Sequence, residues 1–167
     1  MNKHQWQTLG LGALAGLRSM TAPALLAHNL SKYHVPALAH SPLGLLQKPW
    51  VATGLRVLAA SEMASDKLPH MPDRIVPVSL VGRALAGALT GAVLYKANHA
   101  RPLAGALLGG AAALAATFGS FWLRKRASAA SKLPNAVLGG LEDALVLASG
   151  LALSKGTNAG APAGRAL

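Results

Sequence analysis

The feature that most limits what this chain can fold into is one uncharged stretch, Leu103–Leu123. Its 21 residues include no Asp, Glu, Lys or Arg. A helix needs about 20 apolar residues to cross the hydrocarbon core of a bilayer. Because lipid offers no hydrogen-bond partners to the backbone, such a spanning segment must be helical. The stretch therefore predicts a transmembrane helix.

The composition of the whole chain favours the same environment. Only 13% of the residues are charged and 52% are hydrophobic, whereas a soluble domain has about 25% charged residues. The net charge of +11 would also suit nucleic acid. However, the basic residues are scattered between uncharged runs, and the aromatic residues needed for base stacking make up only 4%. We therefore expect the lipid bilayer, and not nucleic acid, as the main partner.

Four more apolar segments raise the expected number of membrane-spanning helices to about five. The expected helices are Leu9–Leu30, Trp50–Lys67, Val76–Tyr95, Leu103–Leu123 and Pro134–Leu153. The first could instead be a cleaved signal peptide, because Lys3 precedes it, but Arg18 would interrupt its apolar core and favours a retained helix. Pro23 should kink or break that helix and free backbone carbonyls beside Arg18. We expect one all-α polytopic transmembrane bundle over residues 1–154 and a disordered Gly/Ala-rich tail over 155–167.

Charge outside the helices gives only a small orientation bias. The segment Ser31–Pro49 is expected to be a loop, and the basic cluster Arg124–Arg126 to follow the fourth helix directly. Such clusters favour the cytoplasmic side of a membrane. With five helices, the N-terminus shares that side.

Small residues recur four positions apart, a spacing that lets helix backbones approach closely. The glycines concerned are Gly12, Gly16, Gly87, Gly91, Gly105, Gly109 and, in a ladder of alanines, Gly140. We expect these faces at helix contacts, either within the chain or between copies in a homo-oligomer.

Charged side chains inside the apolar segments are the main candidates for function. They are Arg18, Arg56, Arg83, Glu62, Asp66, Glu142 and Asp143. Each costs about 2.5–3.5 kcal/mol at a helix centre, so these groups should pair, face water or become neutral. Arginine keeps its charge whereas a carboxylate can protonate. We therefore expect Arg18 or Arg83 within salt-bridge distance of Glu62 or Asp66, which lie four apart on one helix face, and the fifth helix should bring Glu142 or Asp143 to the same cluster.

The expected polar core has two interpretations. Its members are Arg18, Ser19, Thr21, Glu62, Asp66, Lys67, Arg83, Glu142 and Asp143. It could line a path for an ion or a small polar solute, as intramembrane charges often do, or its ion pairs could only lock the helices together. No cofactor or metal is expected, since there are no cysteines and His28, His34 and His40 are spaced unlike helical metal ligands, with no carboxylate near them.

The order of four motifs carries a family resemblance. They are Gly16-Leu17-Arg18-Ser19-Met20-Thr21-Ala22-Pro23, Glu62 with Asp66-Lys67-Leu68-Pro69, Gly82-Arg83, and Glu142-Asp143. Together, over about residues 8–153, they resemble the bacterial membrane-protein family catalogued as domain of unknown function 4126. The resemblance implies a multi-pass protein of the bacterial cytoplasmic (inner) membrane and supplies no substrate or reaction.

Three functions follow from these observations. The leading one is a small transporter or channel-like protein, and the alternative is a structural or assembly protein. An enzyme acting on lipid head groups is least favoured, because no nucleophile–base pair, H-E-x-x-H motif or phosphate loop supports it.

Overall fold

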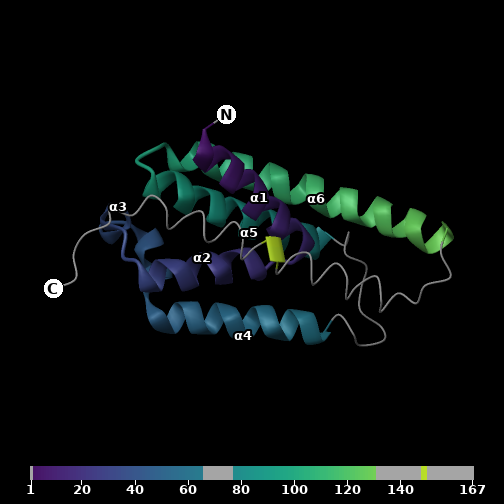
Figure 1. The fold of residues 1–167 in the computed structure, drawn as a ribbon, viewed down its shortest axis with the longest axis horizontal. Coiled ribbons are helices and arrows are strands. Elements are labelled where there is room, and N and C mark those ends of the chain that lie inside the picture. The colour runs from purple at the N-terminus through teal and green to yellow at the C-terminus, as the bar shows by residue number, and fades with distance from the viewer. Residues whose placement is uncertain (1, 66–76, 131–147, 150–167) are drawn as a thin grey trace.

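The computed structural model of this chain describes residues 2–65, 77–130 and 148–149, and the regular structure in these ranges is helical (Figure 1). The elements are α1 (Lys3–Leu17), α2 (Thr21–Lys32), α3 (Pro36–Ala39), the 3-10 helix η1 (Pro42–Gln47), α4 (Pro49–Ser65), α5 (Pro77–Ala97) and α6 (Pro102–Ala130). The predicted all-α class is therefore confirmed for the described residues. The predicted helix Pro134–Leu153, apart from residues 148 and 149, lies outside them, as does the tail 155–167.

Two of the described helices are long and apolar enough to cross a membrane, namely α5 over Pro77–Ala97 and α6 over Pro102–Leu123. Only 22% of the most apolar window of α6 is buried, whereas the core helix of a soluble protein would be covered. Exposed apolar surface of this kind suggests contact with lipid. Of the five or so membrane-spanning helices that the sequence predicts, two have the required length and apolar composition in the part of the chain that the structure describes. Five spans are therefore not confirmed.

Helices α1, α5 and α6 pack through their glycines. A methyl group on Gly12 would lie 2.7 Å from the carbonyl oxygen of Gly109, and a methyl group on Gly91 or Gly105 would collide with the carbonyl oxygen of the other. Gly109 also faces the backbone of Gly87. At these glycines the three helices therefore approach so closely that no side chain larger than hydrogen fits.

The predicted helix Leu9–Leu30 consists of two helices. Helix α1 begins earlier than predicted, where the Gln5 side chain accepts a hydrogen bond from the Asn2 N–H at 2.8 Å, and it ends at Leu17. Arg18 has extended backbone angles, with φ −142° and ψ 109°. The chain breaks ahead of Pro23, which lies in the first turn of α2, where a missing N–H costs no bond within the helix. The break thus leaves main-chain groups of residues 16–20 available to other partners.

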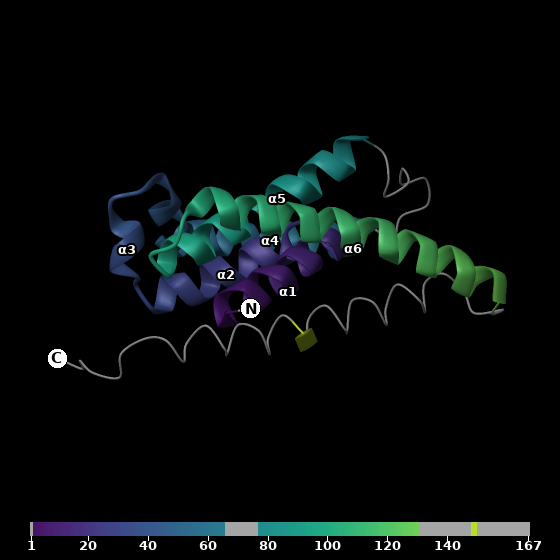
Figure 2. The same cartoon turned by 90° about the horizontal axis from the view of Figure 1, so that it is seen from above.

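Helices α2 and α4 lie side by side, with α4 on the outside of the bundle (Figures 1 and 2). The predicted loop Ser31–Pro49 was wrong in part, because it contains α3 and η1, which pack against α2 or α5. Arg56 lies on the exposed side of α4 and donates a hydrogen bond to Thr53 Oγ1 at 3.0 Å. Its charge therefore needs no partner inside the bundle.

Helix α6 continues through the basic cluster that was predicted to follow it. The helix ends at Ala130, and its last part projects beyond the other described helices (Figure 2). The ammonium group of Lys125 lies 5.7 Å from the centre of the Trp122 ring. A cation in this position is attracted to the ring face, which favours a helix that continues past the apolar segment.

Candidate functional site

The break between α1 and α2 is where buried polar groups from distant parts of the chain meet. At its first side, the carbonyl groups that end α1 face Arg83 of α5. Arg83 Nη1 donates to Gly16 O at 2.6 Å and lies 3.4 Å from Leu17 O. The last carbonyls of a helix have no partner within it and carry the negative end of its dipole. A buried cation is therefore well placed to stabilise this end.

A second donor reaches the same carbonyl from α6. Thr117 Oγ1 lies 2.8 Å from Gly16 O and also 2.8 Å from Ala113 O, so its single proton serves these two oxygens. The approach requires Gly16, because a methyl group there would meet the Ala113 carbonyl. Sequence reasoning missed Thr117, although it is the only threonine in the uncharged stretch of α6.

At the other side of the break, Glu62 of α4 caps the start of α2. Its Oε1 accepts hydrogen bonds from the Ser19 N–H at 3.0 Å and from Ser19 Oγ at 2.8 Å. Its Oε2 accepts from the Met20 N–H at 3.0 Å. These N–H groups form the positive end of the helix dipole, where a carboxylate binds favourably. The two ends of the broken helix are thus each met by a side chain of opposite charge.

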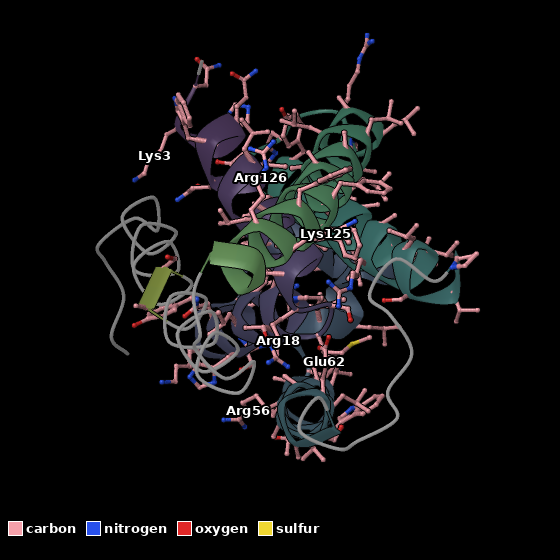
Figure 3. All side chains as sticks on the ribbon, turned by 90° about the vertical axis from the view of Figure 1, so that its right-hand side faces the viewer. Lys3, Arg18, Arg56, Glu62, Lys125 and Arg126 are labelled. Carbon is pink, nitrogen blue, oxygen red and sulfur yellow. The ribbon has the colours of Figure 1, made fainter. Side chains whose placement is uncertain are left out.

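Arg18 lies within the break and is 2% exposed. Its Nη1 donates to the main-chain oxygen of Glu62 at 3.4 Å. Figure 3 shows Glu62 extending from α4 toward Arg18, while Arg56 points to another side of that helix. Arg18 and Glu62 therefore hold α4 against the break together, one through the main chain of α4 and the other through its side chain.

Part of the predicted polar core falls outside the described residues, namely Asp66, Lys67, Glu142 and Asp143. The predicted salt bridge between an arginine, Arg18 or Arg83, and a carboxylate of Glu62 or Asp66 therefore stays a prediction. The same holds for the predicted approach of Glu142 or Asp143 to this cluster. The structure places Arg18, Ser19, Glu62 and Arg83 at one break.

A cavity of about 250 Å³ lies next to the break, between α2 and α4. Thr21 lines it near the break, and the half-buried His28 and the exposed Arg56 also belong to its lining. Among the described residues, the buried Thr21 Oγ1 has no hydrogen-bond partner. A buried hydroxyl without a partner costs stability.

Comparison with known proteins identifies the family of this chain. A family model matches residues 6–160. The chain belongs to the family described as Domain of unknown function (DUF4126). No curated protein and no solved structure matches it. In this DUF4126 protein, residues from three of the four motifs that resemble the family meet at the break. They are the segment around Arg18, Glu62 and Arg83.

Proposed function

We propose that this DUF4126 protein is a small membrane transport or channel-like protein whose ion or polar solute passes the break between α1 and α2. The observation that carries the proposal is the charge arrangement there. Glu62 from α4 meets the start of α2, and Arg83 from α5 meets the end of α1. Discontinuous helices with oppositely charged ends are a common way to build solute and ion sites in transporters.

Glu62 is the group that would control such a site. Its carboxylate accepts hydrogen bonds from three donors at the start of α2. Donors at the start of a helix commonly bind anions, so Glu62 takes the place of a free anion here. Displacing the Glu62 carboxylate with another anion would release these donors and remove one of the two contacts that hold α4 against the break. A resident carboxylate that can be exchanged is therefore suited to gating.

The surface of the bundle supports a membrane location. Large apolar side chains are exposed along both apolar helices, including Val78, Leu85, Leu103 and Leu107, which are 64–82% exposed. The proposal places the protein as a multi-pass protein in the bacterial cytoplasmic membrane, with its N-terminus in the cytoplasm. Lipid and a small ion or polar solute are its proposed partners, and a homo-oligomer is compatible with the exposed helix faces.

Flux through liposomes containing the purified protein tests this function. The probes are protons, followed with an entrapped pH-sensitive dye, and chloride and urea, followed by light scattering after an osmotic jump. We expect the wild type to pass at least one probe and Glu62→Gln to lose that flux, because gating requires the carboxylate to hold and then release these donors. The amide carries no charge and presents an N–H₂ group to one of the donors, so it cannot hold all of them. Ser61, the exposed neighbour of Glu62, provides the control, because Ser61→Ala should keep the flux.

Two results would overturn the proposal: no flux of any probe with the wild type, or unchanged flux with Glu62→Gln. Thermal unfolding of the variant in detergent must accompany the measurement, so that lost flux is not confused with a lost fold. A folded variant without flux supports a path, whereas an unstable variant is compared at the temperature where it stays folded.

A structural role is the second candidate, and one observation favours it. Arg83 and Thr117 both bond the carbonyl oxygen of Gly16, so a single main-chain atom ties α1 to α5 and α6. Buried charged groups can specify helix packing without any transport. For this role, Glu62→Gln should lower thermal stability and the wild type should pass none of the probes.

A further inference from the structure

The turn between α5 and α6 contains a left-handed backbone conformation that glycine usually adopts. The Ala100 N–H donates to Tyr95 O at 2.8 Å, and the His99 N–H donates to Lys96 O at 3.1 Å. This is the hydrogen-bond pattern of a Schellman motif, in which the residue after the helix takes a left-handed conformation. His99 has φ 56°. A side chain is strained here, so an imidazole at this position calls for another explanation.

The side chains of Lys96 and His99 are not needed to finish α5. The motif and the Asn98 side chain, which donates to Leu94 O at 2.7 Å, already supply donors to the carbonyls of Leu94, Tyr95 and Lys96. Within the described part of the chain, neither the Lys96 ammonium nor the His99 imidazole forms a hydrogen bond or ion pair. Both groups are therefore available to a ligand.

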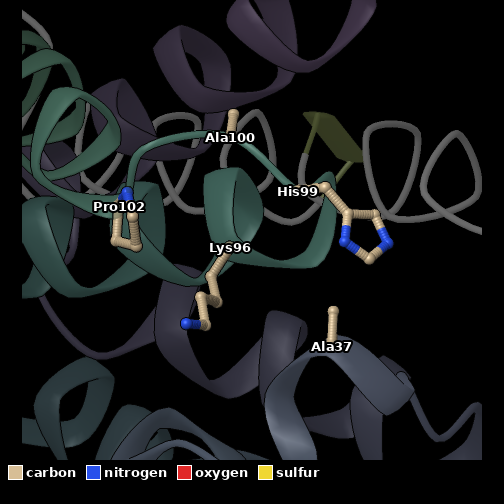
Figure 4. Close-up of a pocket in the computed structure, with 5 residues that line it drawn as sticks. All are labelled: Ala37, Lys96, His99, Ala100 and Pro102. Atoms are coloured by element: carbon tan, nitrogen blue, oxygen red, sulfur yellow. The ribbon is translucent and has the colours of Figure 1, made fainter.

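These two side chains share a cavity of about 290 Å³ with Ala37, Ala100 and Pro102. Figure 4 shows the two side chains extending to different sides of the cavity, with Ala37 on the side of the His99 imidazole. The described residues of the lining include no Asp or Glu. A volume just below the range of about 300–1,000 Å³ for small-molecule sites suits a head group better than a whole lipid.

We propose that this cavity binds the phosphate group of an anionic phospholipid. Lys96 supplies a positive charge with three donors, and the imidazole of His99 supplies an N–H in either protonation state. The location identifies a lipid as the source of the phosphate. Helices α5 and α6 are the two described helices that are apolar enough to cross a bilayer, and their shared turn lies at head-group depth when both cross it. Basic pockets at the ends of membrane helices bind anionic head groups in this way.

The first test measures lipid binding to the full-length protein in a neutral detergent by native mass spectrometry. Phosphatidylglycerol should bind at least tenfold more tightly than phosphatidylcholine. His99→Gly should weaken phosphatidylglycerol binding several-fold and, because glycine suits the left-handed position, should keep or raise the unfolding temperature. This variant separates loss of a ligand from loss of the fold.

Two further variants and one competitor complete the test. Lys96→Gln should weaken binding like His99→Gly, whereas Lys125→Gln, which removes the same charge near the far end of α6, should leave it unchanged. Wild-type affinity in both turn variants would overturn the proposal, and so would an equal loss with Lys125→Gln, which would mean attraction by net charge alone. Displacement of the lipid by an equal concentration of inorganic phosphate would assign the cavity to a free anion and overturn the lipid assignment.

Discussion

Replacing Gly109 with alanine should push α5 and α6 apart. The added methyl group would collide with the carbonyl oxygen of Gly87 and lie 3.1 Å from its carbonyl carbon and 3.2 Å from the Gly91 Cα. These are backbone atoms, which cannot rotate away as the end of a flexible side chain can. The helices must therefore shift, and the shift also disturbs the contact of Gly109 with Gly12 of α1.

The magnitude follows from comparing glycines on the same helix. Alanine gains about 1 kcal/mol over glycine in a helix, and overpacking costs about 1–3 kcal/mol. Gly119 has nothing within 4 Å of an added methyl group, and at Gly110 the nearest atoms lie at 3.4 and 3.6 Å, which is ordinary contact. Gly119→Ala and Gly110→Ala should therefore be neutral or stabilising, and Gly109→Ala should be less stable than either by about 1–3 kcal/mol.

Reversible unfolding in mixed detergent micelles, followed by far-ultraviolet circular dichroism, measures these differences. The three variants carry the same chemical change on one helix, so differences between them report the packing of each site. If Gly109→Ala proves as stable as Gly119→Ala, the close approach of α5 and α6 at Gly87 is wrong.

Three more predictions follow from the described contacts. Thr117→Val should cost about 1 kcal/mol of stability in the same unfolding assay, because a hydroxyl donor to Gly16 O is lost without a change in shape; no change would mean that Arg83 alone satisfies that carbonyl. Reporter fusions after Asn98 and after Lys125 should report opposite sides of a membrane, since the apolar part of α6, Pro102–Leu123, lies between them, and a shared side would refute a spanning α6. In a variant whose only tryptophan is Trp122, which is 57% exposed, brominated lipid should quench the fluorescence strongly, and emission unaffected by the lipid would contradict contact with lipid.

Much of the fold is local in origin and was therefore predictable. The helical class and the positions of α5 and α6 follow from long, mainly apolar runs that can satisfy their backbone in lipid only as helices. The helix ends were predicted less well. The basic cluster continues α6, because Lys125 and Arg126 are good helix formers and nothing in the segment up to Ala130 stops a helix.

The candidate site was predictable in its members but not in its bonds. The sequence singled out Arg18, Glu62 and Arg83 as charges in apolar surroundings, and charge balance predicted that arginines would pair with carboxylates. That pairing stays a prediction, and what the sequence did not predict is the use of main-chain groups: Glu62 accepts hydrogen bonds from N–H groups at the start of α2, and Arg83 donates to carbonyls at the end of α1. The location of the break decides this, because it creates free main-chain donors and acceptors that a continuous helix would not have.

By itself, the sequence determined which segments are apolar, which faces carry glycine and which buried charges need a partner, because composition and spacing act over one or two helical turns. Only the tertiary structure decided that Ser19 meets Glu62, 43 residues along the chain, and that Gly16 meets Thr117, 101 residues along the chain. These contacts depend on which helices cross and at what depth. That choice is made by the packing of all the helices together, and no single segment encodes it.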